Sequence, residues 1–278
     1  MRESLLSDPR IIRTIPVSDD IGVSVRDLGK RYWLRQAAPP TLQHTLVAMV
    51  RRVRSTPFWA LRDVSFDVGA GESIGIIGSN GAGKSTLLRL ICGLGRPTTG
   101  HVEVRGRVAA LLELGAGFHP HLTGRENLYV SAIVSGLRRH EVRDLFDTIV
   151  DFAELSDFID QPLRTYSSGM QMRLGFSVAI HVDPAVMIID EGLAVGDTHF
   201  KQKCLDKIEG FRRAGKTLLI VSHDAGTVRK FCTRALWLRR GALVADGSLE
   251  DVLPRYEAVS RTESLSGLRE AETLAWRR

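Results

Sequence analysis

The sequence predicts an α/β fold built around a mostly parallel sheet. Apolar, strand-like runs alternate with segments of helical periodicity from about residue 70 to residue 224, which is typical of parallel strands joined by crossover helices. The composition fits a folded globular protein, because 44% of the 278 residues are hydrophobic and 25% are charged. A chain of this length can hold one large domain with extensions, or two small domains.

Each expected element follows from its own pattern. Residues 21–33 alternate between apolar and polar side chains, as a strand does, and helical periods run through 123–160 with an interruption at Ser135 and Gly136. A helix that ends at Gly215 has a glycine where helices commonly stop. We expect further strands within 60–68, 72–77, 100–115, 185–191, 216–224 and 235–247, and further helices within 87–94, 170–182 and 201–215.

Three regions stand apart from this alternation. Residues 1–20 form an expected flexible leader, the main domain covers 21–248, and 249–278 form a short, polar helical tail. Within the main domain, 34–58 read as an amphipathic helical insert that Pro57 ends. One face of the insert is apolar and its end carries Arg51, Arg52 and Arg54, so it suits either an anionic membrane surface or plain solvent.

The charge pattern and the cysteines exclude several classes of protein. The net charge of +6 is spread along the chain, whereas a nucleic-acid partner typically requires a dense basic stripe. No run of about 18 apolar residues occurs, and residues 1–20 lack the apolar core of a signal peptide. We therefore expect a cytoplasmic location, and we expect the three cysteines to be reduced core thiols because they form no CxxC pair.

A glycine-rich loop follows the strand at 72–77 and matches the phosphate-binding pattern GxxxxGK[ST] in full. Its glycines let backbone N–H groups surround a phosphate chain, and the helix that follows places its positive end there. Lys84 is expected to reach the β- and γ-phosphates, and the Ser85 hydroxyl to bind Mg²⁺. The expected nucleotide-binding residues are Gly78, Ser79, Asn80, Gly81, Ala82, Gly83, Lys84, Ser85 and Thr86.

Two carboxylates end the apolar strand at 186–189. Asp190 is the expected second Mg²⁺ ligand, and Glu191 the expected general base that polarises the attacking water. The alternative is that the two acidic residues only cap the start of a loop and have no catalytic role. The phosphate-loop lysine upstream, Lys84, argues against this alternative.

The segment Tyr166-Ser167-Ser168-Gly169-Met170 lies about twenty residues before these carboxylates. In that position it resembles the signature motif of ABC ATPases, usually L-S-G-G-Q. The resemblance covers about residues 22–250. It implies a P-loop NTPase core of ABC-ATPase type with an antiparallel β subdomain and a helical subdomain at about 123–182. It also implies that Ser167, Ser168 and Gly169 act on the ATP of a second copy of the chain.

Other positions extend the resemblance. His223 matches the family's switch histidine, and Asp197 matches the aspartate of its dimer-contact loop. Tyr32 lies where an aromatic ring usually stacks on adenine, and Trp33 is the competing candidate. The family's usual Mg²⁺-touching glutamine is not obvious, and Glu113 is the nearest substitute.

Three phrases are similar to those of bacterial ATPases that export O-antigen, capsule or teichoic-acid polysaccharides. They are LLELGAGFHP with LTGREN at 111–127, the Tyr-Ser-Ser-Gly-Met signature, and AVGD at 194–197. The resemblance implies an ATP-hydrolysing, Mg²⁺-dependent homodimer that drives an integral membrane permease for a lipid-linked glycan, at the inner face of the cytoplasmic membrane. An ABC ATPase for another substrate, or a non-transport ABC ATPase, stays open.

Overall fold

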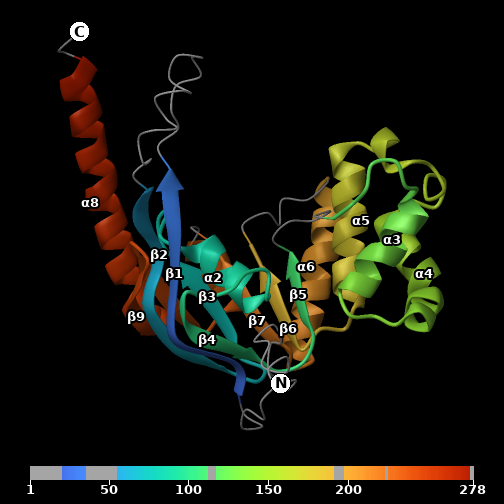
Figure 1. Ribbon diagram of the computed structural model, residues 1–278, viewed down its shortest axis with the longest axis horizontal. Coiled ribbons are helices and arrows are strands. Elements are labelled where there is room, and N and C mark those ends of the chain that lie inside the picture. The colour runs from blue at the N-terminus through green and yellow to red at the C-terminus, as the bar shows by residue number, and fades with distance from the viewer. Residues whose placement is uncertain (1–20, 36–54, 112–116, 191–196, 223–224, 276–278) are drawn as a thin grey trace, which may run out of the picture.

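The computed structural model describes residues 21–35, 55–111, 117–190, 197–222 and 225–275 (Figure 1). Its strands form two sheets. The first sheet is antiparallel with the order β2-β1-β4, and the second has the order β5-β6-β7-β3-β8-β9. The first contains β1 (Ile21–Arg35), β2 (Ser55–Gly69) and β4 (Thr99–Val104). The second contains β3 (Ser73–Ile77), β5 (Val108–Leu111), β6 (Val186–Ile189), β7 (Thr217–Val221), β8 (Arg234–Arg239) and β9 (Ala242–Ser248).

Neighbouring strands of the second sheet are parallel except for β8 and β9. The antiparallel pair is a hairpin whose turn residues, Arg240 and Gly241, have φ values of 49° and 81°, which a two-residue turn of this kind requires. The expected α/β fold, with its mostly parallel sheet and its antiparallel β subdomain, is therefore confirmed.

The helices fall into two groups. α2 (Lys84–Ile91), α6 (Thr198–Arg213), α7 (Ala225–Phe231) and α8 (Leu249–Ala275) accompany the second sheet. α3 (Gly124–Val134), α4 (Arg139–Ala153), the 3₁₀ turn at Leu163–Thr165 and α5 (Ser168–His181) form the helical region at the right of Figure 1. None of the helices in the described ranges is long and apolar enough to cross a membrane.

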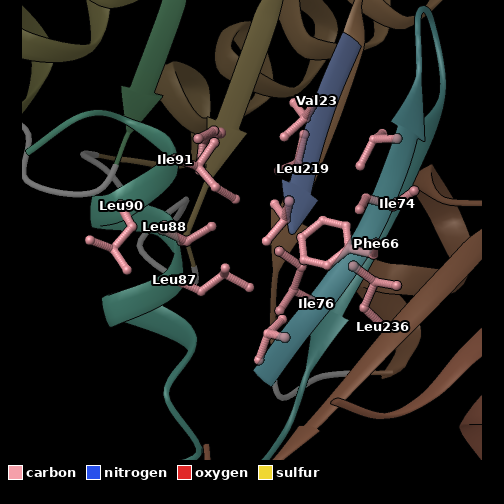
Figure 2. Close-up of a cluster of buried hydrophobic side chains, with 14 of the residues drawn as sticks. Val23, Phe66, Ile74, Ile76, Leu87, Leu88, Leu90, Ile91, Leu219 and Leu236 are labelled. Carbon is pink, nitrogen blue, oxygen red and sulfur yellow. The ribbon is translucent and has the colours of Figure 1, made fainter. Parts of the chain in front are cut away.

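Three clusters of apolar side chains hold these layers together. The first joins α2 to strands of both sheets, and Figure 2 shows Leu87, Leu88 and Ile91 of α2 facing Val23, Phe66, Ile74, Ile76, Leu219 and Leu236. The second covers the other face of the parallel sheet with α5, α6, α7 and α8. The third lies within the helical region, between α3, α4 and α5. The helical region thus has a core of its own and still shares α5 with the sheet.

The three cysteines are free, as expected. Cys204 and Cys232 are buried and Cys92 is partly buried. Burial raises the pKa of each thiol to about 12, so all three stay protonated and unreactive near neutral pH.

The structure corrects three details of the sequence prediction. β2 already begins at Ser55, and Pro57 pairs with Trp33 on β1. The insert predicted at 34–58 therefore cannot be wider than 36–54, and those residues lie outside the described ranges. The tail is a single helix whose Val252, Leu253 and Tyr256 belong to the second core, so its first turns are not polar. α7 was not predicted, because its seven residues are too few to show a helical period.

A buried amide ties the loop before α3 to that helix. Asn127 is 1% exposed. Its Nδ2 donates to the carbonyl oxygens of His119 (3.1 Å), Leu122 (3.2 Å) and Thr123 (2.9 Å), and its Oδ1 accepts from the His119 N–H (2.7 Å). Thr123 and Glu126 add a reciprocal capping box at the same helix start.

Replacing Asn127 by alanine should lower the free energy of unfolding by about 2–4 kcal/mol, because buried backbone groups lose their partners. Urea unfolding of the full chain measures this. The matched control is Asp147→Ala on the exposed face of α4, for which we expect a change within about 0.5 kcal/mol. Equal stability of the two variants would contradict a structural role for Asn127.

Candidate functional site

The phosphate loop, residues 78–85, joins the end of β3 to the start of α2. Two of its glycines are required by the packing. Gly78 has a φ of 154°, and a Cβ there would lie 2.3 Å from the carbonyl oxygen of Leu238. Gly83 has a φ of 108°, and a Cβ there would lie 2.6 Å from the carbonyl oxygen of Ala60. Any larger residue would push the loop away from β2 and β8.

The loop holds one buried cation. Lys84 is 8% exposed, and its Nζ donates to the carbonyl oxygens of Gly78 (2.7 Å) and Ser79 (3.2 Å). The ammonium group therefore lies across the loop instead of extending into solvent. Ser79, Asn80 and Gly81 are exposed on the outer side of the loop, and Thr86 lies on the first turn of α2.

The β8–β9 hairpin braces the loop from the other side. The N–H of Gly241 donates to the carbonyl oxygen of Ala82 (2.9 Å), and the N–H of Arg62 donates to that of Gly241 (2.8 Å). A Cβ on Gly241 would meet the carbonyl oxygen of Ala60 at 2.8 Å. These backbone contacts link both sheets to the phosphate loop. They could not be predicted from the sequence, because no sequence motif corresponds to them.

Asp190 follows β6 directly and is partly buried. Since β6, β7 and β3 are parallel neighbours, Asp190 and Ser85 both lie beyond the carboxyl ends of these strands, where ligands bind in open α/β sheets. Glu191, His223 and Glu113 lie outside the described residues. The residue before His223, Ser222, is 5% exposed at the end of β7.

The β1–β2 hairpin separates the two candidate aromatic residues onto opposite faces. Tyr32 pairs with Phe58 and Lys30 pairs with Leu61, with a register shift between the two pairs. Along β1, the Nζ of Lys30 lies 5.3 Å from the centre of the Tyr32 ring, so the two side chains share a face. The side chain of Leu61 reaches to within 2.8 Å of a Cβ placed on Gly83. Since side chains of a strand alternate between faces, Tyr32 lies on the face that contacts the phosphate loop.

Trp33 lies on the other face. There the guanidinium of Arg31 is 5.0 Å from the Trp33 ring and 5.4 Å from the Trp59 ring. The register thus favours Tyr32 over Trp33 as the residue next to the loop. Phe58, 47% exposed, shares the face of Tyr32. Phe58 could not be identified from the sequence, because only the register of β1 with β2 reveals it.

The signature segment, Ser167–Gly169, begins α5. Ser167 is the N-cap and its Oγ accepts from the N–H of Met170 (3.2 Å). Ser167 and Ser168 are exposed, and a Cβ on Gly169 would meet only Ser167 Oγ, at 3.8 Å. Packing within the chain therefore does not require a glycine at position 169. Because Gly169 has no side chain, the space above the start of α5 is open. In Figure 1, α5 belongs to the helical region and lies apart from α2, the helix that follows the phosphate loop.

A buried tyrosine anchors this helix start. Tyr166 is 6% exposed and its hydroxyl donates to the carbonyl oxygen of Phe158 (2.7 Å). Burial raises its pKa to about 12. A Cβ on Gly124 would lie 2.1 Å from the Tyr166 hydroxyl oxygen, so Gly124 makes room for it.

Asp197 is the N-cap of α6. Its carboxylate accepts from the N–H of Phe200 (2.9 Å) and pairs with the guanidinium of Arg173 on α5. The Phe200 N–H and then Arg173 hold the pKa of Asp197 below its usual range. Arg173 is a second residue that the sequence analysis missed, because its partner lies 24 residues away.

The chain is similar to ATP-binding proteins of known export systems. The profile of the ABC transporter family matches residues 61–194. The O-antigen export system ATP-binding protein RfbB of Myxococcus xanthus is 51% identical over 74% of this chain, and that of Klebsiella pneumoniae is 50% identical over 74%. The teichoic acids export ATP-binding protein TagH of Staphylococcus haemolyticus is 40% identical over 85% of the chain. The chain spans 48% of the Myxococcus protein, 83% of the Klebsiella protein and 88% of the Staphylococcus protein.

A solved structure has the same fold. The ATP-binding cassette MJ0796, in a dimeric post-hydrolysis state bound to ADP and Pi, superposes with a TM-score of 0.63 at 22% identity, over 82% of this chain and 98% of that chain. Because the Klebsiella relative is 50% identical over 83% of its own length, the chain belongs to the ABC transporter family, among its ATP-binding proteins.

Proposed function

We propose that the chain binds and hydrolyses ATP as one half of a homodimer and thereby powers export of a lipid-linked polysaccharide. The observation that carries the proposal is the phosphate loop, which holds the buried Lys84 ammonium between β3 and α2. A lysine ammonium in a glycine-rich loop, at the positive end of a helix, is suited to the β- and γ-phosphates. ADP and Pi in the dimeric MJ0796 cassette support this reading.

Mg²⁺ fits the residues present. Ser85 offers an exposed hydroxyl on the first turn of α2, and Asp190 offers a carboxylate beyond β6. Hydroxyl and carboxylate oxygens are the ligands that Mg²⁺ prefers, so these two residues would hold it, and Glu113, outside the described residues, would be the third ligand. When bound, the ion neutralises charge on the phosphates.

The chain's own residues would divide the reaction between two copies. Residues 78–86 bind the triphosphate, and the signature segment of the second copy covers the γ-phosphate from the other side. Glu191 takes the proton of the attacking water, and His223 holds its orientation. Asp197 lies where the copies meet. The exposed serines and open space at Gly169 support a signature segment that acts outside its own chain.

The transport assignment rests on relatives. The named O-antigen and teichoic-acid export proteins favour a permease partner for a lipid-linked glycan and a peripheral location on the inner face of the cytoplasmic membrane. We assign residues 21–248 to the ATPase domain, about 123–182 to its helical subdomain, and 249–278 to a helical tail. Residues 1–20 and the basic insert at 36–54 lie outside the described residues, and the positive charge of the insert suits a place near the anionic membrane surface.

For the base of ATP, we propose a platform of two aromatic rings, Tyr32 and Phe58. They form a cross-strand pair on the face that contacts the phosphate loop, and both are exposed, at 42% and 47%. A planar base can stack on such a platform.

Glu191→Gln should lower the ATP turnover of the full chain by about 10²–10⁴-fold, the usual contribution of a general base, without loss of ATP binding. In the native host, the same variant should trap lipid-linked glycan inside the cell, as a glycan probe on intact and permeabilised cells would show. Near-normal turnover would refute the role of Glu191. Normal surface glycan with an inactive ATPase would refute polysaccharide export and leave the ATPase assignment standing.

Alanine at Tyr32 or at Phe58 should raise the KM for ATP by about 5- to 150-fold, since stacking on a base contributes about 1–3 kcal/mol, with little change in kcat. Steady-state kinetics with ATP measure this. Trp33→Ala is the matched control, because Trp33 lies on the opposite face of the same strand. A larger effect at Trp33 than at Tyr32 and Phe58 would reverse the assignment of the faces.

A further inference from the structure

The short helix α7 follows the switch segment, His223 and Asp224, directly in the chain. It spans Ala225–Phe231, only seven residues. A helix this short gains little stability from its own hydrogen bonds, so the elements that pack against it set its position. Whatever holds α7 therefore also fixes the point at which the chain continues from His223.

β3 holds one side of α7. Val228 is fully buried, and a Cβ placed on Gly75 of β3 would lie 2.4 Å from Val228 Cγ1. The Val228 side chain thus occupies the space that a side chain at Gly75 would need. Gly75 lies three residues before Gly78, the first residue of the phosphate loop. This contact ties α7 to the strand that leads into the phosphate loop.

α8 holds a second side of α7. Arg229, the residue after Val228, donates from its Nη2 to Glu257 Oε1 of α8 (2.9 Å). Phe231 of α7 belongs to the same apolar cluster as Tyr256 of α8. Consecutive residues of a helix point about 100° apart, so the contacts of Val228 and Arg229 restrain α7 in two directions.

α8 is itself anchored to the β8–β9 hairpin, beside which it lies in Figure 1. Ser248 caps its first turn, because the Ser248 Oγ accepts from the N–H of Asp251 (3.2 Å). Farther along, the buried rings of Tyr256 and Trp237 meet edge to face, with centroids 5.9 Å apart. The same hairpin supports the phosphate loop through the N–H of Gly241. α8 therefore contacts both the helix after the switch segment and the support of the phosphate loop.

We propose that α8 is a brace that holds α7 against β3 and thereby positions His223 relative to the phosphate loop. Glu257 and Tyr256 are its positioning residues: Glu257 binds α7, and Tyr256 anchors α8 to the hairpin. The inference rests on the proposed role of His223 and adds a role for the helical tail.

The brace should matter more for turnover than for folding. The side chains of Arg229 and Glu257 are 48% and 35% exposed, and an ion pair of this kind contributes little to stability. A small misplacement of a catalytic group, in contrast, can lower a rate by about 10²-fold. Loss of the pair is therefore expected in kcat, through His223.

The test exchanges the charges of this ion pair in the full-length protein. Arg229→Glu and Glu257→Arg each bring two like charges together, and the double variant restores an opposite pair with the signs reversed. We expect each single variant to lower kcat by about 5- to 50-fold, with the KM for ATP within about twofold of the wild type, because ATP binding is not affected. The double variant should recover most of the lost turnover.

A conservative pair of substitutions tests the anchor of α8. Tyr256→Leu removes the ring that packs against Trp237 and should lower kcat by a similar factor, whereas Tyr256→Phe keeps the ring and should match the wild type. Circular dichroism checks the folding of every variant. If a charge reversal does not fold, Glu257→Gln, which removes the pair without adding repulsion, takes its place.

Glu209→Arg is the matched control. Glu209 pairs with Arg212 (2.7 Å) and Arg213 (3.2 Å) in the last turns of α6, so its reversal also brings like charges together on a helix of the same apolar core. Glu209 does not contact α7 or the phosphate loop, and its variant should have the kcat of the wild type.

The role of α8 would be overturned by an unchanged kcat in both charge reversals, by a double variant no faster than the slower single variant, by a loss confined to KM, or by an equal loss in Glu209→Arg. The proposed function is tested separately by the wild type and Lys84→Ala. If the wild type hydrolyses ATP and Lys84→Ala does not, the function stands whatever the α8 variants do. If the wild type does not hydrolyse ATP, both proposals fail.

Discussion

The close packing of the phosphate loop between the two sheets is the constraint on which the rest of the site depends. Gly78 lies against the backbone of β8 and Gly83 against the backbone of β2, with no room for a side chain at either position. The N–H of Gly241 closes the arrangement by donating to Ala82. Removing an ammonium group from water is costly unless it finds hydrogen-bond partners. Because the loop is held on both sides, its carbonyl oxygens at Gly78 and Ser79 stay in place and accept hydrogen bonds from the buried Lys84 ammonium. The antiparallel sheet is thus a structural support for the loop, and it also brings Tyr32 and Phe58 to it.

Much of the fold could be predicted from periodicity alone. The strands that became β1, β3 and β7 are apolar or alternating runs, and the helix that became α6 stops just before Gly215, whose φ is 69°. The break between α3 and α4 follows from Ser135 and Gly136. These features are local, so a single sequence contains them. The first turns of α8 were misread as polar, because burial of Val252 and Leu253 depends on how α8 folds back onto the β8–β9 edge of the sheet, which no period within the tail reveals.

The candidate site likewise contains residues that the sequence predicts and residues that only the structure reveals. The phosphate loop, Asp190 and the signature segment are contiguous motifs, and their chemistry can be read from residue types and spacing. Phe58 and Arg173 are different, since each depends on a partner in another element: the register of β1 with β2 for Phe58, and the contact between α5 and α6 for Arg173. Charged and aromatic residues are common on strands and helices, and no pattern within one segment distinguishes these two from the rest.

The central claim is that each ATP site is built from two copies of the chain, and one mixing experiment tests it most directly. Lys84→Ala disables the phosphate loop, and Gly169→Asp places a carboxylate at the signature segment, where the fold has room for a side chain but a phosphate would be repelled. Each variant alone should be inactive. A mixture forms dimers in which one site combines the intact loop of one copy with the intact signature of the other. We predict that mixing the two inactive proteins restores ATP hydrolysis; a mixture that stays inactive, or a Gly169→Asp protein that is fully active alone, would contradict the shared site.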